Sequence, residues 1–149
     1  MNSLDRIKPD WFLRFTLGVM YLYSGIDLLR HPTSWTWALP PWVQGAIETV
    51  MPMLTYIKIQ GMIEILLALV FFAWFLNLKI VRWAALLSAL EMVGILFLSF
   101  TPFKAASFLI TFRDIGVLGA SGALFLILSK TSESRPEIGQ MNNRTMPDA

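Results

Sequence analysis

Ionisable residues interrupt every long apolar segment of this chain. Asp27 lies in the first segment, Glu64 in the second and Glu91 in the third, while Arg113 and Asp114 open the fourth. A charge at the centre of a membrane helix costs roughly 2.5–3.5 kcal/mol on insertion scales. We therefore expect these side chains to meet in a polar interior, where carboxyl groups can hold a ligand, relay protons or form ion pairs.

Nearby polar side chains favour one shared pocket. Ser24 precedes Asp27 by three residues and Gln60 precedes Glu64 by four, spacings that place each pair on one face of a helix. We expect the pocket to open to the extracytoplasmic side, with Glu91 at its floor. The predicted pocket residues are Ser24, Asp27, Gln60, Glu64, Glu91, Arg113 and Asp114.

The same charges also have structural explanations. Glu91 can be a buried, protonated acid that hydrogen-bonds to Ser88 or to a backbone carbonyl. Arg113 and Asp114 can stabilise the fold through ion pairs, and Asp27 is a candidate partner for Arg113 across the helices. These structural roles remain alternatives to ligand binding.

The composition excludes several chemistries. The chain contains no cysteine, which removes thiolate catalysis and cysteine-bound metals, and its single histidine cannot form a paired-histidine metal site. That residue, His31, is expected to be exposed in a loop, and no metal site is predicted. The basic residues are scattered, so nucleic acid is not an expected partner. Arg14 is expected to extend its charge to lipid headgroups.

Hydropathy indicates how the polar residues are positioned. The chain is 56% hydrophobic and 15% charged, with a mean hydropathy of +0.60, whereas soluble domains carry about 25% charged residues. Four segments approach the length of about 20 residues that spans a bilayer: residues 11–29, 58–78, 80–100 and 111–128. We predict an all-α bundle of four transmembrane helices in a lipid bilayer.

A long loop rich in tryptophan and proline joins the first two predicted helices. Its Trp35, Trp37 and Trp42 are expected to anchor at headgroup level, and residues 41–54 favour a short amphipathic helix. Basic residues are more numerous on the side that holds both termini, so the termini are predicted to be cytoplasmic and the loop extracytoplasmic. The predicted organisation is a cytoplasmic N-terminus (1–10), a membrane domain (11–129) and a disordered cytoplasmic tail (130–149).

Small residues are concentrated in the fourth segment. Gly116 with Ala120, and Gly119 with Ala123, form small-xxx-small pairs that permit close helix approach, including approach to a second copy in a homo-oligomer. Their spacing differs from a dinucleotide-binding glycine loop, and no strand is expected before them. The structural interpretation is therefore favoured.

Three stretches together resemble the DoxX-like family of four-helix membrane proteins. They are RFTLGVMYLYSGIDLLRHP in the first segment, GMIEILLAL in the second and FRDIGVLGASGAL in the fourth. The matching positions are Arg14, Gly18, Gly25, Gly61, Glu64, Arg113 and Asp114. The family often has a lysine shortly after the first-helix glycine, where this chain has Asp27 and Arg30.

The resemblance implies a redox-associated subunit of a prokaryotic cell membrane that binds a quinone or another small molecule. Because the chain has no electron carrier of its own, a redox protein partner or a bound cofactor would supply the electrons. Two other functions remain open, namely a proton-coupled transporter and a non-catalytic membrane scaffold. Whether the chain is an enzyme also remains open.

Overall fold

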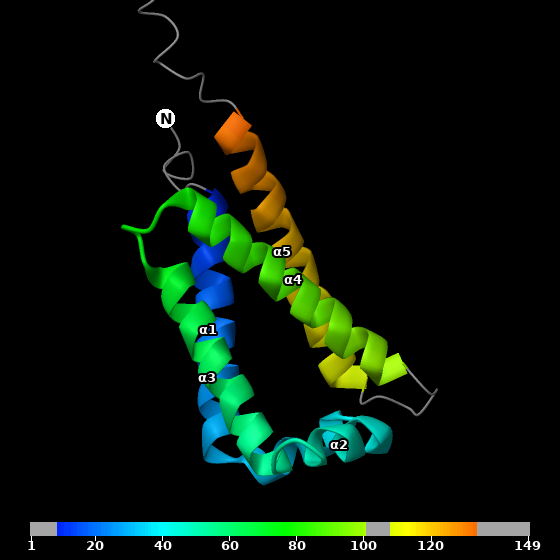
Figure 1. Ribbon diagram of the computed structural model, residues 1–149. Coiled ribbons are helices and arrows are strands. Elements are labelled where there is room, and N and C mark those ends of the chain that lie inside the picture. Colours follow the sequence, from blue (N-terminus) through cyan, green and yellow to red (C-terminus); the bar gives the residue numbers. More distant parts are fainter. Residues whose placement is uncertain (1–8, 101–107, 134–149) are drawn as a thin grey trace, which may run out of the picture.

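The computed structural model describes residues 9–100 and 108–133, and no β-strand occurs in this part of the chain. The expected all-α fold is confirmed (Figure 1). Its elements are α1 (Pro9–Arg30), the 3-10 helix η2 (Pro32–Ala38), α2 (Pro41–Glu48), α3 (Met53–Phe72), α4 (Leu78–Phe100) and α5 (Phe108–Glu133).

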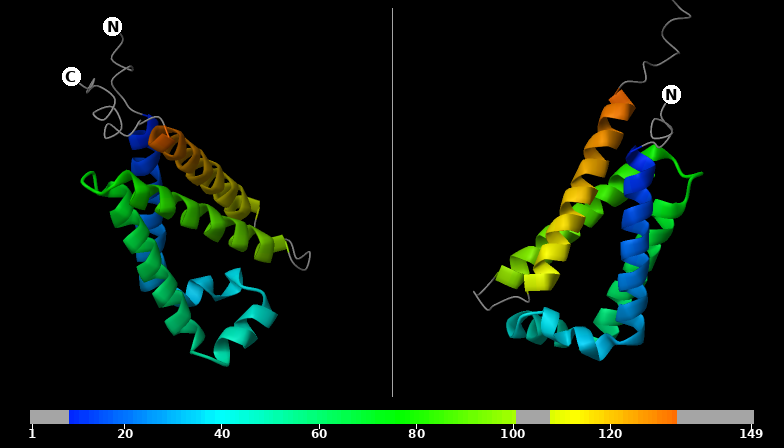
Figure 2. Two further views of the ribbon diagram at one scale, coloured as in Figure 1. Left: turned by 45° about the horizontal axis from the view of Figure 1, so that its top comes forward. Right: turned by 180° about the vertical axis from the view of Figure 1, so that it is seen from behind.

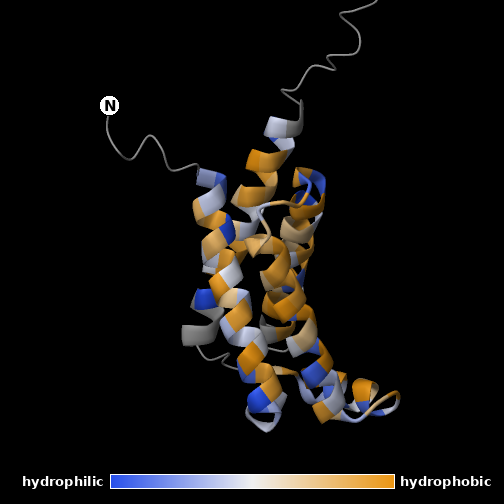
Figure 3. Cartoon of the chain, turned by 90° about the vertical axis from the view of Figure 1, so that its left-hand side faces the viewer, coloured by the Kyte–Doolittle hydropathy of each residue, from blue (hydrophilic) through white to orange (hydrophobic). Residues whose placement is uncertain are grey.

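The four long helices are the candidate membrane spans. Their apolar stretches are Pro9–Arg30, Met53–Phe72, Leu78–Leu98 and Arg113–Thr131, and in each an 18-residue part has only 28–33% of its residues buried inside the protein. Hydrophobic residues run along most of each long helix (Figure 3). Because so much apolar surface faces outward, the chain is a multi-pass membrane protein.

The helices of the first and third spans agree with the predicted bounds to within two residues, whereas those of the second and fourth spans differ more. α3 begins at Met53 rather than Lys58 and ends at Phe72 rather than Leu78. The apolar residues after Phe72 belong to a connection that leaves the helix at Ala73 in an extended conformation. Glu64 consequently lies near the middle of α3.

The loop helix and the last helix end at other residues than predicted. The short helix expected within residues 41–54 is present as α2, although it ends at Glu48. The last helix continues past Lys130 to Glu133. Residues 1–8 and 134–149, on which the terminal predictions mainly depend, lie outside the described residues.

The long helices form two antiparallel pairs, α1 with α3 and α4 with α5 (Figures 1 and 2). The pairs approach each other where α3 connects to α4, and they diverge toward η2 and α2, which lie across the opposite end. We call the end where α3 connects to α4 the terminal end, and the opposite end, which η2 and α2 cross, the η2 end. The main apolar core joins both pairs and includes Leu17, Phe71, Val81 and Leu124.

Glycines bring the backbones of α1 and α3 together. A Cβ atom built on Gly25 would lie 2.7 Å from the carbonyl oxygen of Gly61, and one on Gly61 would lie 2.9 Å from the carbonyl oxygen of Gly25. By contrast, a Cβ atom at Gly116 or Gly119 meets nothing within 4 Å among the described residues. Among the described residues of one chain, these two glycines therefore do not mediate a close helix approach, and their role in a homo-oligomer stays a prediction.

Arg14 is buried against the end of α3 and is only 2% exposed. Its Nε donates to the carbonyl oxygen of Phe71 at 3.2 Å, and its Nη2 donates to that of Ala73 at 2.6 Å. Its guanidinium also lies 4.2 Å from the centre of the Trp11 ring. The expected extension of Arg14 to lipid headgroups is wrong, because the last carbonyls of a helix lack partners within the helix and supply them here.

Candidate ligand-binding site

A cavity of about 480 Å³ lies between the two helix pairs at the η2 end. Residues of α1, η2, α3, α4 and α5 line it. All the predicted pocket residues except Asp27 contribute to the lining. These polar lining residues are Ser24, Gln60, Glu64, Glu91, Arg113 and Asp114.

The carboxyl group of Glu91 accepts hydrogen bonds from side chains of two other helices. Oε1 accepts a hydrogen bond from Nε2 of Gln60 on α3, and Oε2 accepts one from the Tyr21 hydroxyl on α1 at 3.1 Å. The Tyr21 hydroxyl also bonds to Oγ of Ser88 at 2.7 Å, which bonds to Oγ of Ser121 at 2.6 Å. A single hydrogen-bonded chain thus links all four long helices.

Glu64 faces the same cavity with far fewer partners. The residue is 6% exposed, and among the described residues its Oε2 has no hydrogen-bond partner. The side chain of Ser24 lies near the carboxyl group. A buried acceptor without a partner costs about 1–3 kcal/mol, so Glu64 is the least satisfied polar group in the site.

Arg113 and Asp114 bond to each other, although they are adjacent in sequence. Nε and Nη2 of Arg113 lie 3.0 Å and 2.9 Å from Oδ1 of Asp114, which is almost fully buried. The Arg113 guanidinium also lies 5.9 Å from the centre of the Trp35 ring. The expected pairing of Arg113 with Asp27 is therefore wrong.

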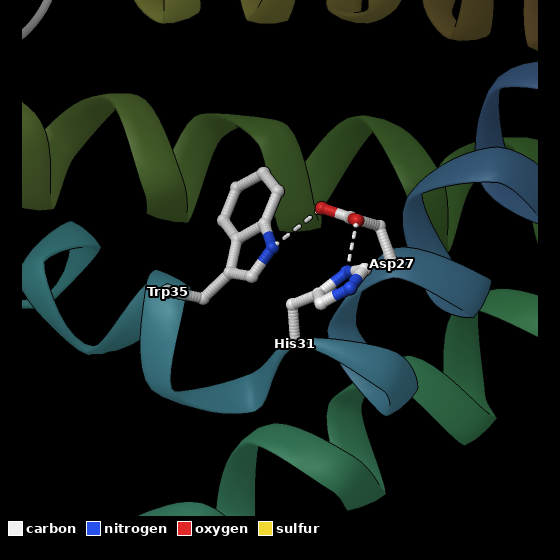
Figure 4. Close-up of polar contacts among 3 residues, drawn as sticks. All are labelled: Asp27, His31 and Trp35. Atoms are coloured by element: carbon white, nitrogen blue, oxygen red, sulfur yellow. Dashed lines mark hydrogen bonds and ion pairs between the residues drawn. The ribbon is translucent and has the colours of Figure 1, made fainter.

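Asp27 instead fixes the start of the loop (Figure 4). Its Oδ1 lies 2.9 Å from Nδ1 of His31, and its Oδ2 accepts a hydrogen bond from Nε1 of Trp35 at 2.8 Å. The chain turns back through η2, which returns Trp35 to Asp27. His31 is exposed, as expected, with 62% of its side-chain surface accessible.

Two residues of the site were not predicted from the sequence. Tyr21 and Trp35 line the cavity and bond to Glu91 and Asp27, respectively, yet neither was a candidate. Tyr21 lies three residues before Ser24, and this spacing places both residues on one helix face, so the spacing could have predicted Tyr21 as a pocket residue. Nothing in the sequence indicated the turn that brings Trp35 to the cavity.

The cavity lining is unbalanced in charge. Glu64, Glu91 and Asp114 contribute carboxyl groups, whereas Arg113 is the one basic residue among the described lining residues. The remaining lining includes aromatic residues of α1, η2 and α3, namely Tyr21, Tyr23, Trp35, Trp37 and Tyr56. No group of three potential metal ligands occurs in the part of the chain that the structure describes.

Comparisons of the chain with protein-family models, curated proteins and solved structures found no match. The resemblance to DoxX-like proteins therefore stays a prediction.

Proposed function

We propose that this protein binds a small amphipathic molecule in the cavity between its two helix pairs. The observation that carries the proposal is that Glu64 lines the cavity and that its buried Oε2 lacks a hydrogen-bond partner among the described residues. A ligand that donates a hydrogen bond would satisfy this atom. The volume of about 480 Å³ suits a small ligand, because ligand pockets measure about 300–1,000 Å³.

The site combines fixed polar groups with an apolar and aromatic wall. Gln60 and Tyr21 hold Glu91, and Arg113 and Asp114 hold each other, so these groups are set before a ligand enters. Preset polar groups reduce the ordering that binding requires. The arrangement therefore supports specific binding better than a purely structural role for the acids.

A redox-associated role requires that the ligand be a quinone or a related electron carrier. The resemblance to DoxX-like proteins is the reason to test this class. Electrons would have to come from a redox protein partner or another bound cofactor. In this proposal the termini are cytoplasmic, the membrane is that of a prokaryotic cell, and the cavity opens to the extracytoplasmic side.

The polar chain favours binding over transport. It runs from Glu91 through Tyr21 and Ser88 to Ser121, where the described hydrogen bonds stop. Leu124 and Leu128 continue α5 toward the terminal end as buried apolar residues. A proton relay needs polar groups or water along its path, and the apolar core beyond Ser121 offers few such groups.

The proposal can be tested by filling the cavity. Gly94 lines the cavity, and a Cβ atom there meets nothing within 4 Å among the described residues, so Gly94→Phe should occupy ligand space without a backbone clash. Gly119→Phe is the matched control, because Gly119 is equally open but lies outside the cavity lining.

The measurement is mass spectrometry of small molecules that co-purify with the protein in native nanodiscs. We expect the wild type and Gly119→Phe to retain a molecule that Gly94→Phe loses. Retention by Gly94→Phe at the wild-type level would contradict the proposal. A soluble short-chain quinone, titrated into the same three proteins, tests the redox-associated role separately.

A further inference from the structure

We propose that the ligand carries a protonated amine, which Glu64 binds within the aromatic part of the cavity wall. This inference rests on the proposed ligand-binding function and specifies the chemical class of the ligand. Three observations lead to it: the unmatched carboxyl groups, the unsatisfied Glu64 oxygen and the positions of the aromatic rings.

The first observation is the charge balance. Arg113 forms its ion pair with Asp114, both members of which line the cavity. Neither Glu64 nor Glu91 forms an ion pair with a described lining residue, although Arg113 also acts electrostatically on Glu64. A cationic ligand would supply the missing positive charge in a setting where the low dielectric strengthens the attraction.

The second observation is the pattern of donors and acceptors. Both oxygens of Glu91 already accept hydrogen bonds, from Gln60 and Tyr21, whereas Oε2 of Glu64 accepts none from the described residues. A protonated amine brings N–H donors and a positive charge in the same group. A quaternary ammonium lacks the donor and an alcohol lacks the charge, so neither would satisfy Glu64 as well.

The third observation is the aromatic wall. Trp35 is fixed by its hydrogen bond to Asp27, and its ring already has the Arg113 guanidinium 5.9 Å from its centre. Aromatic faces attract ammonium groups through the same electrostatic interaction. Apolar lining residues such as Leu28, Ile57 and Met92 provide contacts for a hydrocarbon body. Together these features suit an amphipathic amine.

The experiment compares probes that share one body and differ in the head. Phenylbutylamine, its trimethylammonium counterpart and phenylbutanol are titrated into the full chain in nanodiscs by calorimetry, with empty nanodiscs subtracted. We expect the amine to bind most tightly, about tenfold or more above the alcohol, with the quaternary ion between them. The short-chain quinone serves as a second neutral probe and should also bind more weakly than the amine.

Variants of Glu64 then assign the preference to this residue. Glu64→Gln keeps the shape and removes the charge, so it should weaken amine binding by about tenfold and leave alcohol binding within about threefold. Glu64→Asp keeps the charge and should retain the preference for the amine. Glu48→Gln is the matched control, because Glu48 is exposed on α2 and lies outside the cavity lining.

The outcomes separate the two proposals. Equal affinities for amine and alcohol in the wild type would overturn the amine assignment, and this comparison stands even if Glu64→Gln fails to fold. If neutral probes bind without any preference for the amine and Gly94→Phe abolishes their binding, the cavity proposal stands alone. If no probe binds above empty nanodiscs and no molecule co-purifies, both the amine assignment and the proposed function fail.

Discussion

The α1/α3 pair and α5 contain similar small residues but differ in how they pack. Gly25 and Gly61 face each other so closely that neither could carry a Cβ atom without a clash, whereas Gly116 and Gly119 face open space among the described residues. α5 is tied to α4 instead by the hydrogen bond between Ser121 and Ser88. A small-residue pattern therefore shows that close packing of a helix is possible, but the partner helix determines whether close packing occurs.

The largest effect should come from substitution at the α1/α3 contact. Gly25→Leu forces a side chain into the Gly61 backbone, which cannot yield as a flexible side chain would. Overpacking of this kind costs about 3 kcal/mol of unfolding free energy or more, whereas Gly119→Leu should change it by less than about 0.5 kcal/mol. Denaturant unfolding in detergent, followed by circular dichroism, measures both. Equal losses would remove the contrast between the helices.

A smaller loss is expected from Arg14→Met, which removes the donors to the Phe71 and Ala73 carbonyls. Hydrogen bonds to charged groups contribute about 1.5–3 kcal/mol, so a loss of about 2 kcal/mol is expected in the same unfolding measurement. Arg30→Met is the control, since Arg30 is exposed at the end of the same helix. If the control loses as much stability, the contact between Arg14 and α3 does not stabilise the pair.

The smallest effect should come from the hydrogen bond of α5. Ser121→Ala removes the bond to Ser88 and should cost about 1 kcal/mol. Ser129→Ala removes only a bond to the Phe125 carbonyl of the same helix and should cost little. The same unfolding assay applies. A larger loss for Ser129→Ala would show that the bond between α4 and α5 is not what stabilises this region.

The sequence predicts the number and type of helices because hydropathy reports membrane-crossing segments directly. It misplaced α3 because Trp74 and Phe75, although apolar, are exposed in the connection after the helix rather than part of it. Hydropathy measures compatibility with lipid and cannot distinguish a helix from an apolar turn. Residue spacing within a span is therefore more reliable than the ends of the span.

The candidate site was predictable where helix geometry alone decides. Gln60 and Glu64 both line the cavity because a spacing of four residues puts them on one helix face, whereas Ser24 lines it without Asp27. The partner of Asp27 was not predictable, because it depends on the turn through η2 that brings Trp35 back. Whether the lining residues bind a ligand stays a prediction.

The burial of Arg14 also affects how the protein adapts to its surroundings. The guanidinium donates to the carbonyl oxygens of Phe71 and Ala73, so these two carbonyls need neither water nor phosphate groups as hydrogen-bond partners. The exposed Trp74 and Phe75 beside it are compatible with hydrocarbon. These carbonyls can therefore lie at the edge of the hydrocarbon layer with their hydrogen bonds already made.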